Sequence, residues 1–245
     1  MSITSYPRLS TASYFFQIGL GEVSGATFIH KFGAVPEMSN NTSGSVWDVS
    51  DTFYPWSSWT TPSTVLVDRA STSDANKQIR IEGLDQNYEL VSDTVTLTTA
   101  TGNSSTVSFS RVYRAYVIGA SSENVGDIDI RVSSTVVARI NEGKGQTLMA
   151  IYTVPANHTA YLMQGTATCE YGSDFSGDMY VRYFGSDAFR IGHAFEVSGA
   201  GGQYFYKFTV PIAIPEKSDI DVRATTRSNN ARATAAFDII LVEND

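Results

Sequence analysis

Apolar and polar residues alternate with a period of two along much of the chain. In Gln78-Ile79-Arg80-Ile81-Glu82 the two isoleucines fall on one side and the polar residues on the other, as expected for a strand with one buried face. The same signal recurs, between clusters of Gly, Asn, Ser and Asp, at 63–69, 88–98, 105–118, 126–140, 146–154, 159–169, 178–184, 203–211, 218–225 and 235–242. Regularly spaced strands without crossover helices predict an all-β protein, built from antiparallel β-sandwich or jelly-roll modules.

The first 45 residues differ from the rest, because their polarity is mixed and their periodicity is weak. They end in the turn-forming cluster Ser39-Asn40-Asn41-Thr42-Ser43-Gly44, and we interpret 1–45 as an extended N-terminal arm. The large apolar side chains of the arm are too many for a solvated linker, and they include Tyr6, Tyr14, Phe15, Phe16, Phe28 and Phe32. These side chains must be buried, either on the protein's own sheets or on a neighbouring subunit, and we favour the neighbour.

The remaining chain is long enough for two small β modules, since autonomous domains usually contain about 100–150 residues. The polar, glycine-containing stretch Asn141-Glu142-Gly143-Lys144-Gly145 interrupts the strand signals and suits a boundary. We therefore predict a first β-sandwich module over 46–143 and a second β-sandwich or jelly-roll module over 144–245.

Composition and charge exclude several classes of protein. Hydrophobic residues make up 42% of the chain, which is ordinary for a globular protein and excludes a disordered chain. The formal charge of −8, without any basic run, argues against a nucleic-acid partner. No stretch reaches the roughly 18 apolar residues that a membrane span needs, and the N-terminus lacks the pattern of a secretory signal. We expect a protein made and retained in a cytoplasm, without a membrane partner.

The chemistry needed for catalysis is largely missing from the sequence. The three histidines, His30, His158 and His193, have no zinc-ligand spacing, and none lies beside the single cysteine, Cys169. Nucleophile-elbow and phosphate-loop motifs are absent. We therefore predict no catalytic residues, no metal and no cofactor, and a protein that is not an enzyme.

Two pairs of carboxylates have the spacing of same-face neighbours on a strand. They are Asp127 with Asp129 and Asp219 with Asp221, and each pair is followed two residues later by an arginine. Such pairs could serve acid–base catalysis or bind calcium. The arginine that follows favours a surface charge ladder instead, and single substitutions should then change stability by only about 0–1 kcal/mol.

All three tryptophans, Trp47, Trp56 and Trp59, lie within one short segment that also contains Phe53 and Tyr54. Three interpretations stay open for this cluster. It can be a local core under a proline-containing loop, an anchor on a subunit or partner surface, or a platform that stacks on sugar rings.

Four stretches of the chain resemble a known family. They are Lys31-Phe32-Gly33-Ala34-Val35-Pro36, Ile79-Arg80-Ile81-Glu82-Gly83-Leu84-Asp85, Gly145-Gln146-Thr147-Leu148-Met149-Ala150-Ile151-Tyr152-Thr153-Val154-Pro155 and Ala236-Phe237-Asp238-Ile239-Ile240-Leu241-Val242-Glu243-Asn244-Asp245. Nearly the whole chain, in this order, resembles a family of small virion structural proteins in tailed phages of marine bacteria and cyanobacteria. The resemblance implies membership of a virion and leaves open a position on the capsid, neck, tail or fibre.

From these observations we expect a capsid decoration or cement protein of a bacteriophage, located in the virion and assembled in the host cytoplasm. The expected partners are further copies of the chain, with a homotrimer favoured, and the major capsid protein or another virion protein. The candidate interface comprises Tyr6, Tyr14, Phe15, Phe16, Phe28, Phe32, Trp47, Trp56 and Trp59. Removing residues 1–32 should then leave a folded protein that no longer occupies particles. The alternative is a tail or fibre component that binds host glycans through the tryptophan cluster.

Overall fold

The computed structural model describes residues 14–119, 122–170, 172–198 and 202–244. In this part of the chain nearly all regular structure is β, and every pair of neighbouring strands is antiparallel. The predicted all-β, antiparallel fold is therefore confirmed. The short helices are α1 (Tyr14–Gly19), η1 (Trp56–Trp59) and η2 (Thr72–Asp74).

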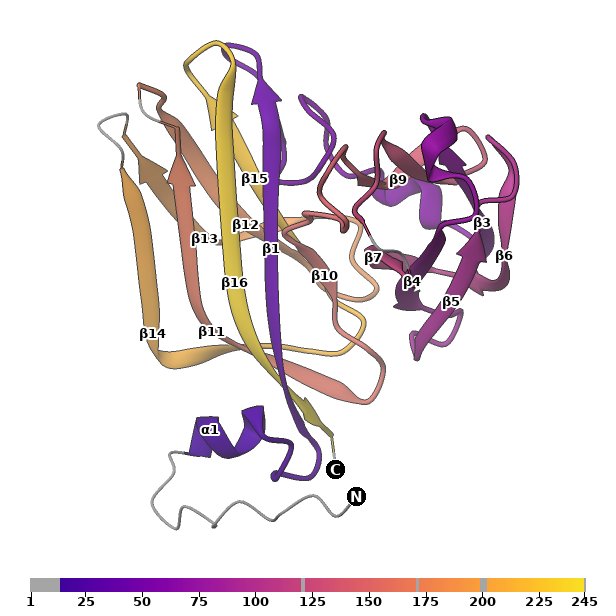
Figure 1. The fold of residues 1–245 in the computed structure, drawn as a ribbon. Helices are drawn as coiled ribbons and strands as arrows, with labels where there is room; N and C mark the ends of the chain where they lie inside the picture. The colour runs from indigo at the N-terminus through magenta and orange to yellow at the C-terminus, as the bar shows by residue number, and fades with distance from the viewer. Residues whose placement is uncertain (1–13, 120–121, 171, 199–201, 245) are drawn as a thin grey trace, which may run out of the picture.

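Two of the four sheets face each other as a sandwich (Figure 1). The first has the order β1 (Ala26–Met38), β16 (Ala231–Glu243), β11 (His158–Cys169), β14 (Gln203–Ile214). The second has the order β10 (Ile151–Thr153), β15 (Asp219–Thr226), β12 (Phe175–Arg182), β13 (Arg190–Val197), and β2 (Ser43–Ser45) also pairs with β15. Val35, Phe175, Val222, Phe237 and Ile239 are among the residues of the core between them.

The other two sheets lie beside the sandwich and share a second hydrophobic core (Figure 1). One has the order β6 (Asn103–Phe109), β3 (Ser63–Arg69), β8 (Ile128–Val132), β9 (Thr135–Ile140). The other has the order β5 (Leu90–Thr96), β4 (Gln78–Leu84), β7 (Arg111–Ile118). Ile79 and Ile81, which the alternation places on an inward face, are both fully buried in this core.

The chain passes from one core to the other at two points where adjacent residues face opposite ways. Val46 packs in the first core and Trp47 in the second, and the same division separates Tyr152 from Ile151. Both crossing segments press against β1 at Gly33. A Cβ there would lie 2.3 Å from the carbonyl oxygen of Val46, so this close approach requires glycine.

The predicted arm needs correction where the structure describes it. Ala26–Met38 do not extend from the molecule but form β1, which pairs with β16 along its length. The alternation is weak because the crossing segments cover one end of the strand, so that Gly33, Ala34 and Val35 are buried in succession. Removing residues 1–32 would delete half of β1, and it cannot leave the fold intact. Residues 1–13, which include Tyr6, lie outside the described residues.

Candidate interaction surface

The three tryptophans are buried inside the protein. Trp47, Trp56 and Trp59 are 2%, 8% and 6% exposed, and each indole nitrogen donates a hydrogen bond. Trp47 donates to the Thr52 carbonyl oxygen, Trp56 to Asp221 Oδ2 and Trp59 to the hydroxyl of Tyr54. The cluster therefore forms a local core, the first of the three interpretations. An exposed partner or sugar surface made of these residues is excluded.

The two carboxylate pairs occupy different environments. Asp127 and Asp129 are half-buried, and Asp129 pairs with Arg139 at 2.6 Å. Asp219 and Asp221 are 2% and 0% exposed, so the predicted surface ladder is wrong for this pair. The sequence pattern misleads because β15 is flanked on one side by β12 and on the other by β10 and β2, and its polar face meets the second core rather than solvent.

Asp219 ties the two cores together. Oδ1 accepts hydrogen bonds from Arg111 Nε at 2.9 Å and from Thr153 Oγ1 at 2.6 Å, while Oδ2 accepts from Arg182 Nη2 at 2.5 Å. Arg111 belongs to β7 beside the second core, and Asp219 belongs to β15 of the sandwich. Both guanidinium groups also lie over the ring of Trp56, at 5.6 and 5.5 Å. This arrangement is a buried structural ion pair.

The exposed aromatic residues gather on α1 and β1. Tyr14, Phe15 and Phe16 are 61%, 55% and 53% exposed, and Phe28 and Phe32 are 47% and 37% exposed. Apart from Gln17, the side chains of the helix are aromatic or aliphatic and none is charged, but the helix is too short to bury more than Ile18. Ile18 packs with Ala26 and Ile240 in a small cluster of its own. Five of the predicted interface residues are thus presented to solvent by one helix and one strand.

The outer face of the first sheet continues this aromatic surface across the strands. Phe28 lies opposite Ile240, which in turn lies opposite Tyr161 of β11, and directly opposed side chains share a face. Further along this face, Asp238 accepts from Gln164 Nε2 and contacts His30 Nδ1, both at 2.5 Å. We call α1 together with Phe28, Phe32 and Tyr161 the aromatic surface.

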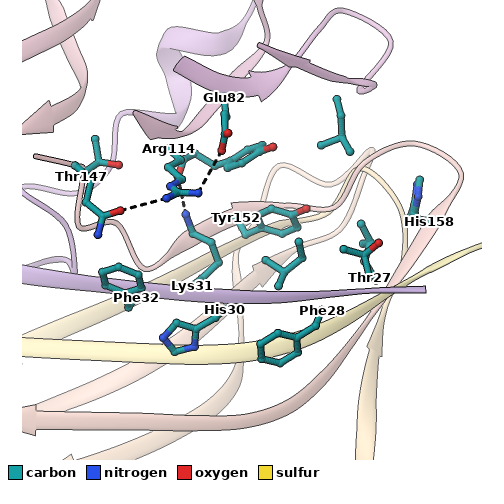
Figure 2. A pocket seen from close by; sticks show the side chains of 15 residues that line it. Thr27, Phe28, His30, Lys31, Phe32, Glu82, Arg114, Thr147, Tyr152 and His158 are labelled. Atoms are coloured by element: carbon teal, nitrogen blue, oxygen red, sulfur yellow. Dashed lines mark hydrogen bonds and ion pairs between the residues drawn. The ribbon is translucent and has the colours of Figure 1, made fainter. Parts of the chain in front are cut away.

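Next to the aromatic surface, a cleft opens between β1 and the sheet β5-β4-β7 (Figure 2). It has a volume of about 450 Å³, and six consecutive residues, Thr27 to Phe32, line one side of it. Glu82, Tyr113 and Arg114 contribute to the other side, with Tyr152 behind them. The sequence gives no motif for this cleft, since its two sides come from segments 50 or more residues apart and neither contains a spacing typical of a site.

Lys31 is the buried charge of the cleft. Its Nζ donates to the Tyr113 carbonyl oxygen at 2.5 Å and lies 5.5 Å from the ring centre of the same tyrosine. Burial, together with the nearby Arg114 guanidinium, lowers the pKa of Lys31 to about 7. In the described ranges no carboxylate lies within ion-pair distance of this ammonium group. Lys31 is therefore a buried amine with hydrogen-bonding capacity left unused.

The described ranges contain neither a metal-binding cluster of side chains nor a membrane-spanning helix. No group of three or more His, Cys, Asp and Glu side chains there could hold a metal ion. None of the helices in those ranges has the length and apolar character needed to span a membrane.

Comparison with known proteins does not identify a family for this chain. No protein-family model matches the chain, and no curated protein matches it. Among solved structures it is similar to that of the infectious bursal disease virus Gt strain, with a TM-score of 0.21 and 9% identity over 95% of this chain and 78% of that chain. It is also similar to the VP2 subviral particle of infectious bursal disease virus, with a TM-score of 0.23 and 9% identity over 90% and 73% of the two chains. At these TM-scores the likeness carries no argument about function.

Proposed function

We propose that this protein is a structural subunit of a tailed-bacteriophage particle, specifically a capsid decoration or cement protein without a catalytic role. The strand order supports this proposal. Counted along the chain, the sandwich strands are β1 and then β10 to β16, and they form sheets in the orders 1-8-3-6 and 2-7-4-5. This is the arrangement of a double-sheet jelly roll, an architecture used by viral capsid domains and also by lectins.

The aromatic surface is the observation that carries the proposal, because a fold alone does not specify a function. Large apolar side chains that gather on one exposed face mark an interaction site. Burying each of them against a neighbour would contribute about 1.5–3 kcal/mol before ordering costs. Several such contacts, repeated over a lattice, suit a subunit that covers a shell.

We further propose that the partners are other copies of the chain, as a homotrimer, together with the major capsid protein or another virion protein. The location would be the virion, after assembly in the host cytoplasm. The division into modules 46–143 and 144–245 remains part of this proposal. The pairing of β1 with β16 supports adding residues 26–45 to the second module.

The alternative is a tail or fibre module that binds host glycans. It is favoured less, because the tryptophan cluster that would contact sugar is buried in the protein's own core. Loss of glycan binding on Trp56→Ala would not identify a sugar site, since this substitution removes a hydrogen bond to Asp221 and opens a cavity in the core.

The proposal is tested by adding the protein to particles from which the subunit has been removed and measuring how much of it binds to them. The double variant Phe15→Asp and Phe16→Asp places two charges on the aromatic surface, where the helix is exposed. We expect at least a tenfold loss of occupancy, measured by gel densitometry and cryo-microscopy, with an unchanged thermal melt.

The matched control is Phe184→Asp, which changes an equally exposed phenylalanine (62%) outside the aromatic surface. It should occupy particles as the wild type does. Normal occupancy by the double variant would contradict the proposed contact. The same reconstruction locates the subunit, and a position on a tail fibre would favour the alternative.

A further inference from the structure

The edge of β1 that faces the cleft has unpaired backbone groups. In an antiparallel pair, the N–H and C=O of every second residue point toward the partner strand and the others point away. The Gly25 carbonyl oxygen accepts from Glu243 at the end of β16, whereas the Ala34 N–H donates away from β16, to Leu148. The backbone groups of Phe28, His30 and Phe32 therefore point away from β16, and nothing in the described part of the chain pairs with them.

The cleft beside this edge has the dimensions of a strand-binding groove. Its volume of about 450 Å³ lies within the usual range for ligand sites. The six residues that line it, Thr27 to Phe32, span about 17 Å at the rise of a β-strand. Beyond Gly33 the crossing segments close over β1, so the open edge has a defined end. An extended backbone fits both the hydrogen-bonding groups and the shape.

The charge of the cleft indicates which side chain such a strand would carry. Lys31 has no carboxylate partner in the described ranges, and the Arg114 guanidinium lies on the facing wall (Figure 2). The one carboxylate of the cleft, Glu82, is already engaged by Arg114 at 3.7 Å and by the Tyr116 hydroxyl at 3.1 Å. With Lys31 protonated, the cleft thus has an excess of positive charge, which an acidic side chain would balance.

We propose that this cleft binds an extended segment of a different protein, which adds as a strand to the edge of β1 and places an acidic side chain beside Lys31. Main-chain hydrogen bonds to Phe28, His30 and Phe32 would supply affinity, and the acidic side chain would supply specificity. The inference goes beyond the proposed function, because it uses the backbone edge of β1 and Lys31 rather than the exposed aromatic rings, although Phe28 and Phe32 line the cleft as well.

The composition of two segments, the first thirteen residues and β14, argues against either of them as an occupant supplied by a second copy. The first thirteen residues contain no Asp or Glu and one basic residue, Arg8. The exposed strand β14, which pairs only with β11 among the described strands, likewise contains no acidic residue and one basic residue, Lys207. Either segment would bring a positive charge toward Lys31 and Arg114.

The test uses fluorescein-labelled heptapeptides of alternating Thr and Val with Glu at the centre, and fluorescence anisotropy with the full chain. We expect saturable binding of the Glu peptide. A matched peptide with central Lys should bind at least tenfold more weakly, and a peptide with alternate backbone nitrogens methylated should not bind. Absence of binding at millimolar peptide, or equal binding of the methylated peptide, would overturn the proposal.

Two variants, each with a matched control, test the backbone pairing and the charge of the cleft separately. Phe28→Pro removes an outward N–H without breaking the ladder to β16, whereas Phe28→Ala keeps that N–H. Lys31→Met removes the charge, and Lys207→Met on β14 is its control. We expect at least tenfold weaker binding for Phe28→Pro and Lys31→Met only. Equal binding by Lys31→Met would overturn the acidic specificity. A wild-type oligomer that Phe28→Pro dissociates and Phe28→Ala does not would show a second copy to be the occupant, because both variants lose the ring and only the first loses the outward N–H.

Discussion

The segments 127–131 and 219–223 have the same pattern of Asp, apolar residue, Asp, apolar residue and Arg. In the first, the side chain of Asp129 is 26% exposed and pairs with Arg139 on the neighbouring strand β9. In the second, the side chain of Asp219 is 3% exposed and accepts hydrogen bonds from Thr153, Arg111 and Arg182. One pattern therefore gives a solvent-accessible charge pair in one sheet and a buried ion network in another.

The difference arises from what covers each strand. The polar face of β8 stays accessible to water, so Asp127 and Asp129 keep part of their hydration. The polar face of β15 is covered by η1 and β7, which bring Trp56 and Arg111 onto Asp221 and Asp219. Alternation along a strand specifies which residues share a face. It does not specify whether that face meets solvent or another part of the protein.

The largest difference between the two segments is expected in the free energy of unfolding when Asp219 is removed. Asp219→Ala leaves the buried Arg111 and the partly buried Arg182 without their carboxylate, which costs about 3–5 kcal/mol of the free energy of unfolding. Asp129→Ala is the matched control and should cost about 1 kcal/mol or less. Urea denaturation followed by tryptophan fluorescence measures both. Equal losses for the two variants would show that the burial of Asp219 has no energetic consequence.

A smaller difference is expected in the coupling energy between each aspartate and its arginine. A double-mutant cycle with Arg111→Met and Asp219→Asn isolates the pair that joins β7 to β15. We expect a coupling energy of about 1–3 kcal/mol, because the pair is desolvated and in direct contact. The matched cycle on Arg139 and Asp129 should give about 0.2–1 kcal/mol. A coupling at Arg111 no larger than at Arg139 would show that other contacts hold the two cores together.

The strands could be predicted from the sequence to the extent that their periodicity is local. Ile79 and Ile81 lie in the second core as the alternation predicts. The strand β1 could not be found in this way, because the crossing segments at Val46 and Ala150 bury successive residues of it and hide the period of two. Those segments are distant in sequence, and no local pattern reports their position.

The predicted interface residues likewise differ in whether local sequence or distant segments determine their exposure. Phe15 and Phe16 are exposed because α1 is too short to bury them. The sequence predicts their role from composition alone, because 1–45 contains too many large apolar side chains for a solvated linker. Trp56 is buried because Arg111 and Asp221 come to it from other strands. A cluster of tryptophans in the sequence therefore signals a core or a surface equally well, until its distant neighbours are known.

The smallest effect concerns the dependence of stability on pH. Burial raises the pKa of Asp221, and the opposing effects of Arg223 and of the hydrogen bond from Trp56 do not cancel it. An unfolded aspartate has a pKa of about 3.9. Between that value and the raised pKa, the folded protein holds a proton that the unfolded chain has released. The free energy of unfolding should therefore increase as the pH falls through this window, and this contribution is lost as the pH rises above the folded pKa.

Asp221→Asn removes this titration while keeping an oxygen that can accept from Trp56. Subtracting the stability of the variant from that of the wild type at each pH isolates the aspartate, and other buried carboxylates such as Asp48 cancel in the difference. We expect the difference to change by up to about 1.4 kcal/mol per pH unit within the window. Trp56→Phe should extend the upper limit of the window to higher pH, because it removes a hydrogen bond that stabilises the carboxylate in the folded protein. Parallel curves for wild type and Asp221→Asn, measured by urea denaturation from pH 4 to 8, would mean that Asp221 is as well solvated as an ordinary surface carboxylate, and the contrast between the two segments would then rest on Asp219 alone.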